Sequence, residues 1–155
     1  MSEKLQPHVR PIAFAGTELL LDMIYLVQSF YKIDLESLLI LHCINDATMR
    51  PFMTDPNLTA ETLTAARPPD DIRGAISRRM IADKTGLARE TVRRKTNDLI
   101  ASGIVLVDSE DRLRIAQFLD RPDLQRLLID GHKVAIRYLD RLTSYGVDWR
   151  NVPDA

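Results

Sequence analysis

Apolar side chains recur at helical spacing along much of this chain, beginning near its N-terminus. From Thr17 to about Lys32 they repeat every three or four positions, which predicts a helix with one buried stripe. The stripe consists of Leu20, Met23, Ile24, Val27, Phe30 and Tyr31. Residues 1–16 contain two prolines and a glycine, so we expect an irregular arm there.

A second helix is predicted over residues 35–48, with Asp34 as its N-cap and its end before Pro51. Its apolar positions are too dense for a surface helix, so residues 17–50 are interpreted as two N-terminal helices, the second in the core. Residues 51–72 hold four of the eight prolines. A connection this long is unusual in a compact domain, and we expect a mobile loop.

The pattern changes again between residues 73 and 118. Two short helices are predicted, from Ser77 to Gly86 and from Ala88 to Ser102, each followed by a glycine stop signal. Two strands, 104–107 and 112–117, follow with a tight acidic turn between them. This order is typical of a winged helix-turn-helix core.

Residues 119–155 are predicted to contain one long C-terminal helix, with Asp120 as its cap, Pro122 in its first turn and its end at about Tyr145, before Gly146. Its apolar residues are Leu124, Leu127, Leu128, Val134, Tyr138, Leu139, Leu142 and Tyr145. Such a helix can complete a monomeric core or pair with a second copy, and we expect a homodimer. The fold class expected is mainly α: a winged helix-turn-helix with flanking N- and C-terminal helices and a small β-hairpin wing.

Composition narrows the class of protein. The chain has 155 residues and a single cysteine, Cys43, which favours a reducing compartment. The N-terminus has no signal-peptide pattern, and no uninterrupted apolar run approaches the ~20 residues of a membrane span. We therefore expect a cytoplasmic protein with no membrane partner.

Catalytic and metal-binding chemistry is not indicated. The three histidines, His8, His42 and His132, are far apart in the sequence, and none has metal-ligand spacing with Cys43. His42 and Cys43 lie on an apolar helix and are interpreted as a buried structural pair. The six glycines form no phosphate-binding loop. We expect no enzyme activity, no cofactor and no metal; the sequence identifies no small-molecule effector.

Charge is distributed unevenly. The net charge is −1, yet residues 71–95 carry eight basic and three acidic side chains, a local charge of +5. The rest of the chain therefore sums to −6. A basic stripe on an acidic body is typical of a DNA-binding surface, although a solvated helix face would give the same pattern.

The basic stripe coincides with the two short helices. A helix-turn-helix needs a small residue where its helices cross, a residue that tolerates positive φ in the turn, and apolar side chains beneath. The residues that meet these needs are Ala82, Gly86, Leu87 and Val92. The outer face of the second helix offers Arg89, Glu90, Arg93 and Arg94. Arginine bonds guanine and glutamate accepts from cytosine, so these four are the candidate base contacts.

The stretch Arg89-Glu90-Thr91-Val92-x-Arg94, with the turn Thr85-Gly86-Leu87, resembles the recognition unit of the catabolite-activator/Fnr family. The resemblance covers about 30 residues. It implies that Arg89, Glu90 and Arg94 face bases and that Arg78 and Thr91 contact phosphates.

Two departures from that family stand out. The nucleotide-binding barrel that precedes the family's motif is replaced here by helices, and Ala88 stands where a capping serine is common. The overall layout looks more like MarR- and GntR-type winged helices. The full set of candidate DNA-backbone contacts is Arg78, Arg79, Lys84, Thr91, Lys95, Arg112 and Arg114.

These observations lead us to expect a sequence-specific transcriptional regulator that binds double-stranded DNA as a homodimer on a pseudo-palindromic operator. Two alternatives stay open: a winged-helix protein-interaction module, and a replication or partition DNA-binding protein. The acidic tip of the hairpin would repel phosphates, so we expect the wing mainly to brace the domain.

Overall fold

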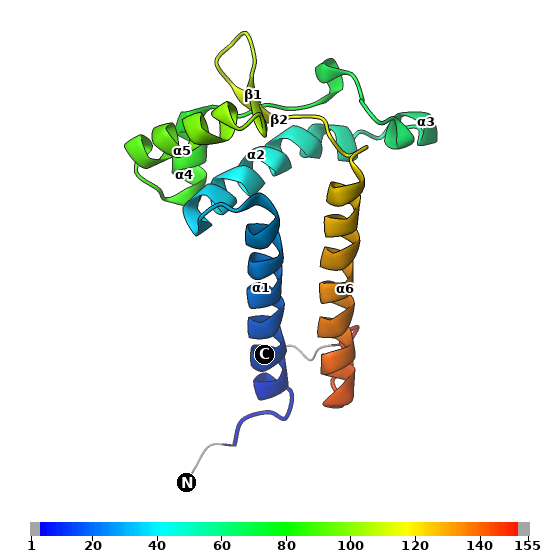
Figure 1. Ribbon diagram of the computed structural model, residues 1–155. Coiled ribbons are helices and arrows are strands. Elements are labelled where there is room, and N and C mark those ends of the chain that lie inside the picture. The colour runs from blue at the N-terminus through cyan, green and yellow to red at the C-terminus, as the bar shows by residue number, and fades with distance from the viewer. Residues whose placement is uncertain (1–3, 152–155) are drawn as a thin grey trace. The chain divides into compact units, whose positions relative to one another are not determined.

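Two long helices from opposite ends of the chain lie side by side and antiparallel (Figure 1). They are α1 (Val9–Tyr31) and α6 (Pro122–Ser144). The computed structural model describes residues 4–151, and within it this helix pair is one unit while residues 33–121 form a second. The protein is mainly helical with one small antiparallel sheet, as the sequence predicts.

Helix α1 begins eight residues earlier than predicted. The N-terminal arm of residues 1–16 is therefore wrong from Val9 onward. Pro11 lies in the first helical turn, where its missing N–H has no intrahelical partner to lose. Thr17 is not a cap, because its hydroxyl donates to the Ala13 carbonyl one turn earlier (2.9 Å). Gly16 is tolerated within the helix at a cost of roughly 1 kcal/mol relative to alanine.

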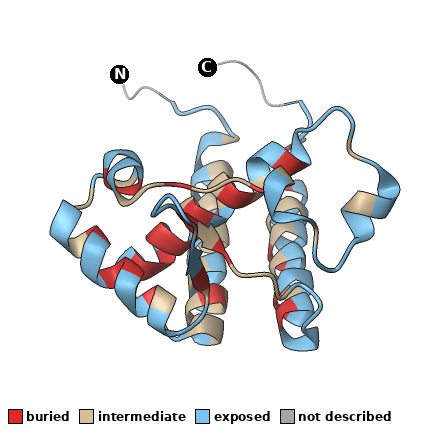
Figure 2. Ribbon diagram, turned by 90° about the horizontal axis from the view of Figure 1, so that it is seen from above, coloured by how far each residue is buried: buried red, intermediate tan, exposed pale blue. Residues whose placement is uncertain are grey.

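The stripe predicted to be buried on α1 is largely open. Val27 is buried, but Leu20 and Met23 are exposed. On α6 the prediction is better, since Leu124, Leu127, Val134 and Leu142 are all buried. Val134 and Leu142 lie on the side of α6 that faces α1. Figure 2 shows that buried residues gather in the second unit, whereas much of the long helix pair is exposed or intermediate.

The second unit is built on α2 (Leu35–Met53), which packs against α4 (Arg78–Thr85), α5 (Arg89–Ala101) and the sheet. Its core consists of aliphatic side chains from all of these elements, chiefly Ile40, Leu41, Ile44, Ile81, Val92, Leu99, Val105 and Leu113. The dense apolar pattern of α2 thus predicts its core position correctly.

Helix α2 continues through Pro51 to Met53, two residues past the proline that was expected to end it. A proline inside a helix leaves the carbonyl four residues earlier without its N–H partner, and here that carbonyl belongs to Ala47. Gly74 passes against this carbonyl, since an added Cβ would come within 2.1 Å of the Ala47 oxygen. The Gly74 N–H donates to the neighbouring Thr48 carbonyl (2.9 Å), which attaches the chain to α2 at this point.

The segment expected to be a loop contains a short helix, α3 (Ala60–Thr64), and a 3-10 turn, η1 (Asp70–Ile72). Thr59 caps α3 by accepting from the Thr62 N–H (3.1 Å). The C-terminal end of the whole segment, where η1 lies, is attached to the rest of the unit by the ion pairs of Asp70.

The sheet consists of β1 (Val105–Val107) and β2 (Leu113–Ile115), paired in the register Val105–Ile115. Both strands are one or two residues shorter than predicted at their ends. Ile76 forms an additional antiparallel bridge with Leu113. A third extended segment therefore lies beside β2, directly before α4.

Length and composition give α1 a property that its short uninterrupted apolar runs do not reveal. Among the described residues it is the one helix long and apolar enough to cross a membrane by those criteria. Between positions 11 and 31 its only charged residues are Glu18 and Asp22. Because core helices of soluble proteins and signal sequences meet the same criteria, this property alone assigns no membrane role.

Candidate nucleic-acid interface

The bend between α4 and α5 is made by Gly86. Helix α4 begins at Ser77, whose side chain accepts from the Met80 N–H (3.2 Å). It ends at Gly86, which has φ of 72° and donates its N–H to the Ala82 carbonyl (2.9 Å). A positive φ of this size favours glycine strongly, as the motif requires.

The two helices share a buried inner face. Ala82 and Val92 are buried beside Ile81, and Leu87 is half-buried in the turn. The side of α5 that faces the core also carries Thr96 and Leu99, both buried. This face leaves the opposite side of α5 in solvent, so α5 is held firmly with one polar surface outward.

All four candidate base-contact residues are exposed on α5: Arg89, Glu90, Arg93 and Arg94. Glu90 and Arg93 bond to each other through two hydrogen bonds of 2.8 and 2.6 Å. This pairing holds the pKa of Glu90 below its ordinary value and raises that of Arg93. Arg89 and Arg94 form no hydrogen bond or ion pair with any residue that the structure describes.

Asn97 extends the outward face of α5 and was missed in the sequence. At about 100° per residue, Glu90, Arg94 and Asn97 fall on the same side of the helix, opposite the buried residues. The spacing of these three residues, four and then three positions, is the signal in the sequence that could have placed Asn97 on this face. Asparagine bonds adenine in the major groove, although here its side-chain oxygen accepts from Arg78 (3.5 Å).

Arg78 joins three elements. Its guanidinium donates to the Thr96 hydroxyl on α5 (3.1 Å) and to Asp111 in the hairpin turn (3.0 Å). The side chain is only 25% exposed. The resemblance implied a phosphate contact for this residue, whereas its observed bonds brace α4 against α5 and the turn.

Lys95 is buried, which corrects its prediction as a DNA-backbone contact. Its ammonium lies 2.5 Å from Asp34 and 3.4 Å from Glu36, at the start of α2. The bond from Lys95 lowers the pKa of Asp34 to about 2, helped by the Ser37 N–H. Because its charge points into the second unit and is already paired, Lys95 cannot reach a phosphate in this conformation.

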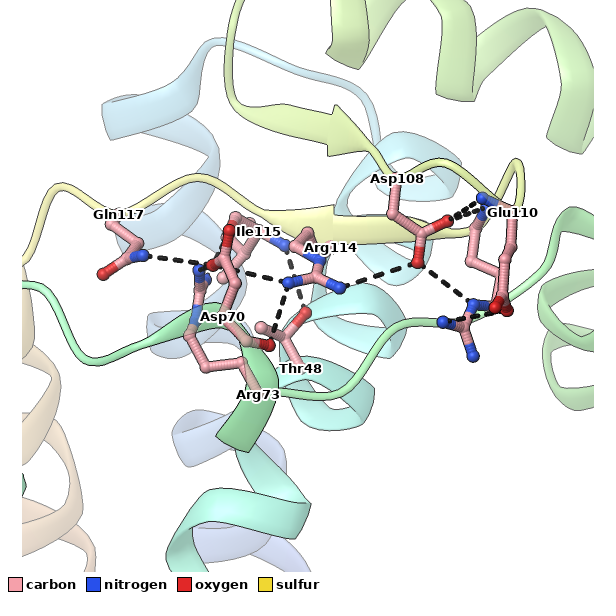
Figure 3. A network of polar contacts seen from close by, with 9 residues as sticks. Thr48, Asp70, Arg73, Asp108, Glu110, Arg114, Ile115 and Gln117 are labelled. Atoms are coloured by element: carbon pink, nitrogen blue, oxygen red, sulfur yellow. Dashed lines mark hydrogen bonds and ion pairs between the residues drawn. The ribbon is translucent and has the colours of Figure 1, made fainter.

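Arg114 is also part of the interior, so it too is withdrawn as a backbone contact. Figure 3 shows it between Asp70 and Asp108, with ion-pair distances of 3.3 and 3.5 Å. Its side chain is only 12% exposed. Arg73, which is buried, reaches the same Asp70 (2.9 Å) and the Ile115 carbonyl. This cluster attaches the end of the long connection to β2.

The hairpin turn is stabilised by its own charges. Arg112 pairs with Asp108 and Glu110, each at 3.0 Å. Asp108 also accepts from the Glu110 and Arg112 backbone N–H groups, and these bonds lower its pKa. Arg112 is still partly exposed, but its cation is already compensated, which agrees with a bracing role for this turn.

Four cations of the basic stripe are left without an ion pair among residues 4–151: Arg79, Lys84, Arg89 and Arg94. The other four, Arg73, Arg78, Arg93 and Lys95, are each paired with a carboxylate. Thr91 lies half-exposed beside them on the first turn of α5. The surface available to phosphates is thus about half of what the sequence suggests.

Helix α5 begins without a side-chain cap, because Ala88 has no acceptor to offer. The first N–H groups of such a helix favour negative charge. In α5 these N–H groups lie next to Arg89, at the end of the helix that follows the Gly86 turn.

Metal-binding residues do not converge within the described part of the chain, where no group of three or more His, Cys, Asp or Glu side chains is placed to hold an ion. The expected buried pair of His42 and Cys43 is wrong: His42 is exposed and Cys43 is half-buried. Both lie on α2, whose core face is formed by other positions. Partial burial raises the pKa of the Cys43 thiol.

Comparison with known proteins gives no further assignment: no protein-family model, curated protein or solved structure matches this chain.

Proposed function

We propose that the protein is a winged helix-turn-helix transcriptional regulator that binds double-stranded DNA as a homodimer on a pseudo-palindromic operator. The element order of the second unit supports this fold. Helix α2 is followed by the Ile76 bridge, α4, α5 and the β1–β2 hairpin. In a winged helix these correspond to the first helix, the first strand, the helix-turn-helix and the wing.

The observation that carries the proposal is the exposed polar surface of α5. One side of this helix is buried, and the rest presents Arg89 and Arg94, which have no hydrogen bond or ion pair with any residue among 4–151, next to the Glu90–Arg93 pair. Arg94 lies on the side of Glu90 and Asn97, whereas Arg89 projects from the first turn, about 140° around the helix. Arginines at such positions suit guanine edges in the major groove. Arg79 and Lys84 on α4 supply positive charge for the flanking phosphates.

The test is a comparison of base preference among alanine variants. Binding sites are first selected from a random DNA library, and affinity is then measured by fluorescence anisotropy for the selected site and its single-base variants. Arg89→Ala and Arg94→Ala should each cost about 1–3 kcal/mol and relax the preference at one position of each half-site.

Arg79→Ala and Arg126→Ala are the controls. Arg79→Ala removes a phosphate contact, so it should weaken binding to all sequences about equally. Arg126 is an exposed arginine of α6, outside the second unit, and its replacement should leave affinity unchanged. Arg78 is a poor control because its loss also breaks the contacts between α4, α5 and the turn. Unchanged discrimination in both α5 variants would refute base reading by this helix.

A protein-interaction module would give a different result. Its basic surface would meet an acidic protein, and DNA affinity would be weak and the same for any duplex. Selection from the random library would then enrich no sequence.

A further inference from the structure

The α1–α6 pair has two chemically different long sides. On one side Glu18 bonds to Arg141 (3.0 Å) and Asp22 lies 3.4 Å from Arg137. Arg141 also lies over the ring of Phe14, 5.6 Å from its centroid. This side is therefore closed by ion pairs within the chain.

The opposite side carries no Asp, Glu, Lys or Arg at positions 11–31 of α1 or anywhere in α6, and Arg10, in the first turn of α1, lies at its edge. At about 100° per residue, it is the side of α1 centred near Leu20 and the side of α6 centred near Leu128. Its exposed members are Val9, Leu20, Met23, Leu128, His132 and Ile136. We call this surface the uncharged side.

Burial in this unit is unusually incomplete. Of the described residues, the helix-pair unit buries seven hydrophobic side chains and exposes twelve large ones, whereas the second unit buries thirteen and exposes eight. Two helices alone cannot enclose a core, because each buries only one stripe against the other. The missing cover must come from outside the pair.

We propose that the uncharged side docks onto the same side of a second copy of this chain, forming a four-helix bundle. This inference specifies the interface of the homodimer proposed above and does not depend on DNA binding. Each helix has 23 residues and is about 35 Å long, so two adjacent helices offer roughly 700 Å². That is close to the ~800 Å² per partner found in stable interfaces.

A second copy fits this surface better than a lipid bilayer does. Helices that lie on membranes carry an excess of Lys and Arg along their polar face. In α1 and α6 together, one and four basic residues are matched by two and three acidic ones, so the helix pair has no net positive charge. Gly131 of α6 already lies against Met23 and Leu26 of α1, so the pair is closely packed. A two-fold axis then covers both uncharged sides at once.

The experiment measures the mass of the full chain in solution without DNA, by sedimentation or light scattering over a range of concentrations. Wild type should have twice the chain mass of 17.6 kDa. Leu20→Glu, on the uncharged side, should raise the dimer dissociation constant about 100-fold or more, since a buried unpaired carboxylate is costly. Leu128→Glu tests the same surface from α6.

Tyr25→Glu is the matched control. Tyr25 lies on α1 and is 61% exposed, as is Leu20, but it is five positions and about 140° around the helix. The Tyr25→Glu variant should remain a dimer. Circular dichroism verifies that all three variants keep their helices, which is expected because Leu20, Leu128 and Tyr25 are all exposed.

Each outcome decides the proposal. A monomeric wild type would refute it, and so would equal dimerisation of Leu20→Glu and Tyr25→Glu. Wild type that is monomeric in solution but sediments with phospholipid vesicles would assign the surface to a membrane. A dimer without sequence preference for DNA would refute the proposed function alone, while a monomer that binds a half-site would refute this inference alone.

Discussion

Asp34 has two roles at the start of α2. One carboxylate oxygen accepts from the Ser37 N–H (2.9 Å) and caps the helix. The other receives the Lys95 ammonium of α5. A single exposed side chain thus joins the first helix of the unit to the helix that carries the candidate base contacts.

Replacing Asp34 should destabilise the second unit in a pH-dependent way. The pKa of Asp34 is about 2, below its ordinary value of 3.8, so its contribution is present above pH 3.8 and is lost as the pH falls toward 2. Asp34→Asn keeps an acceptor for the cap and removes the charge. At pH 7 it should cost about 1 kcal/mol, because the exposed carboxylate of Asp34 is partly screened by solvent.

Urea unfolding of wild type and Asp34→Asn at several pH values checks this prediction. The difference between them should be constant near neutrality and should shrink between pH 3.8 and 2. Asp34→Ala removes the cap as well, so its loss should be greater by about 1 kcal/mol. A difference that is the same at pH 7 and pH 2 would show that the Lys95 pair contributes nothing.

The sequence could not predict which charged residues of the site pair with one another in the folded protein. Lys95 and Arg114 were grouped with the basic stripe because a local sum of charges cannot reveal a carboxylate brought near by folding. Asp34 lies 61 residues from Lys95, and Asp70 lies 44 residues from Arg114. In contrast, Gly86 and Ser77 were placed correctly because their roles depend on neighbouring residues only.

Elements with local end signals were predicted to within one or two residues. Ser77 and Gly86 bound α4, and Gly103, with φ of 75°, follows α5. The predictions failed where packing overrides a local rule. Helix α2 passes through Pro51, and α1 begins before Pro11 and Gly16. The energetic cost of a proline or a glycine within a helix is small compared with the cost of leaving a long apolar helix unformed.

At the scale of elements, Gly74 marks a close approach between α2 and the segment that follows it. Gly74→Ala would place a methyl group within 2.1 Å of the Ala47 carbonyl oxygen, so backbone must move. We expect a loss of about 2–4 kcal/mol in stability, measured by urea or thermal unfolding.

Gly16→Ala is the matched comparison. Gly16 lies within α1, and an added Cβ there meets no atom within 4 Å. Alanine should stabilise that helix by about 0.5–1 kcal/mol. Equal effects of the two substitutions would mean that the close approach at Gly74 is not maintained in solution.

For the molecule as a whole, the salt dependence of DNA binding reflects how much of the basic stripe is already compensated internally. Four of the eight cations of the stripe have no ion pair among the described residues and are free to displace counterions, so the plot of log affinity against log salt should have a slope of roughly −3 to −4 per chain. Anisotropy titrations at several salt concentrations measure it. If all eight basic residues of the stripe contacted phosphates, the slope would be near −7. Such a value would mean that ion pairs such as Arg78–Asp111 open on binding.

The order in which the chain is synthesised gives the helix pair a special difficulty. Helix α1 leaves the ribosome first, but α6 begins about 90 residues later. At ~5–20 residues per second, the nascent apolar helix waits several seconds for its companion, while the intervening unit has all of its own sequence and can fold. During that interval the apolar surface of α1 is open to chaperones and to aggregation, whereas α6 emerges with its companion already present.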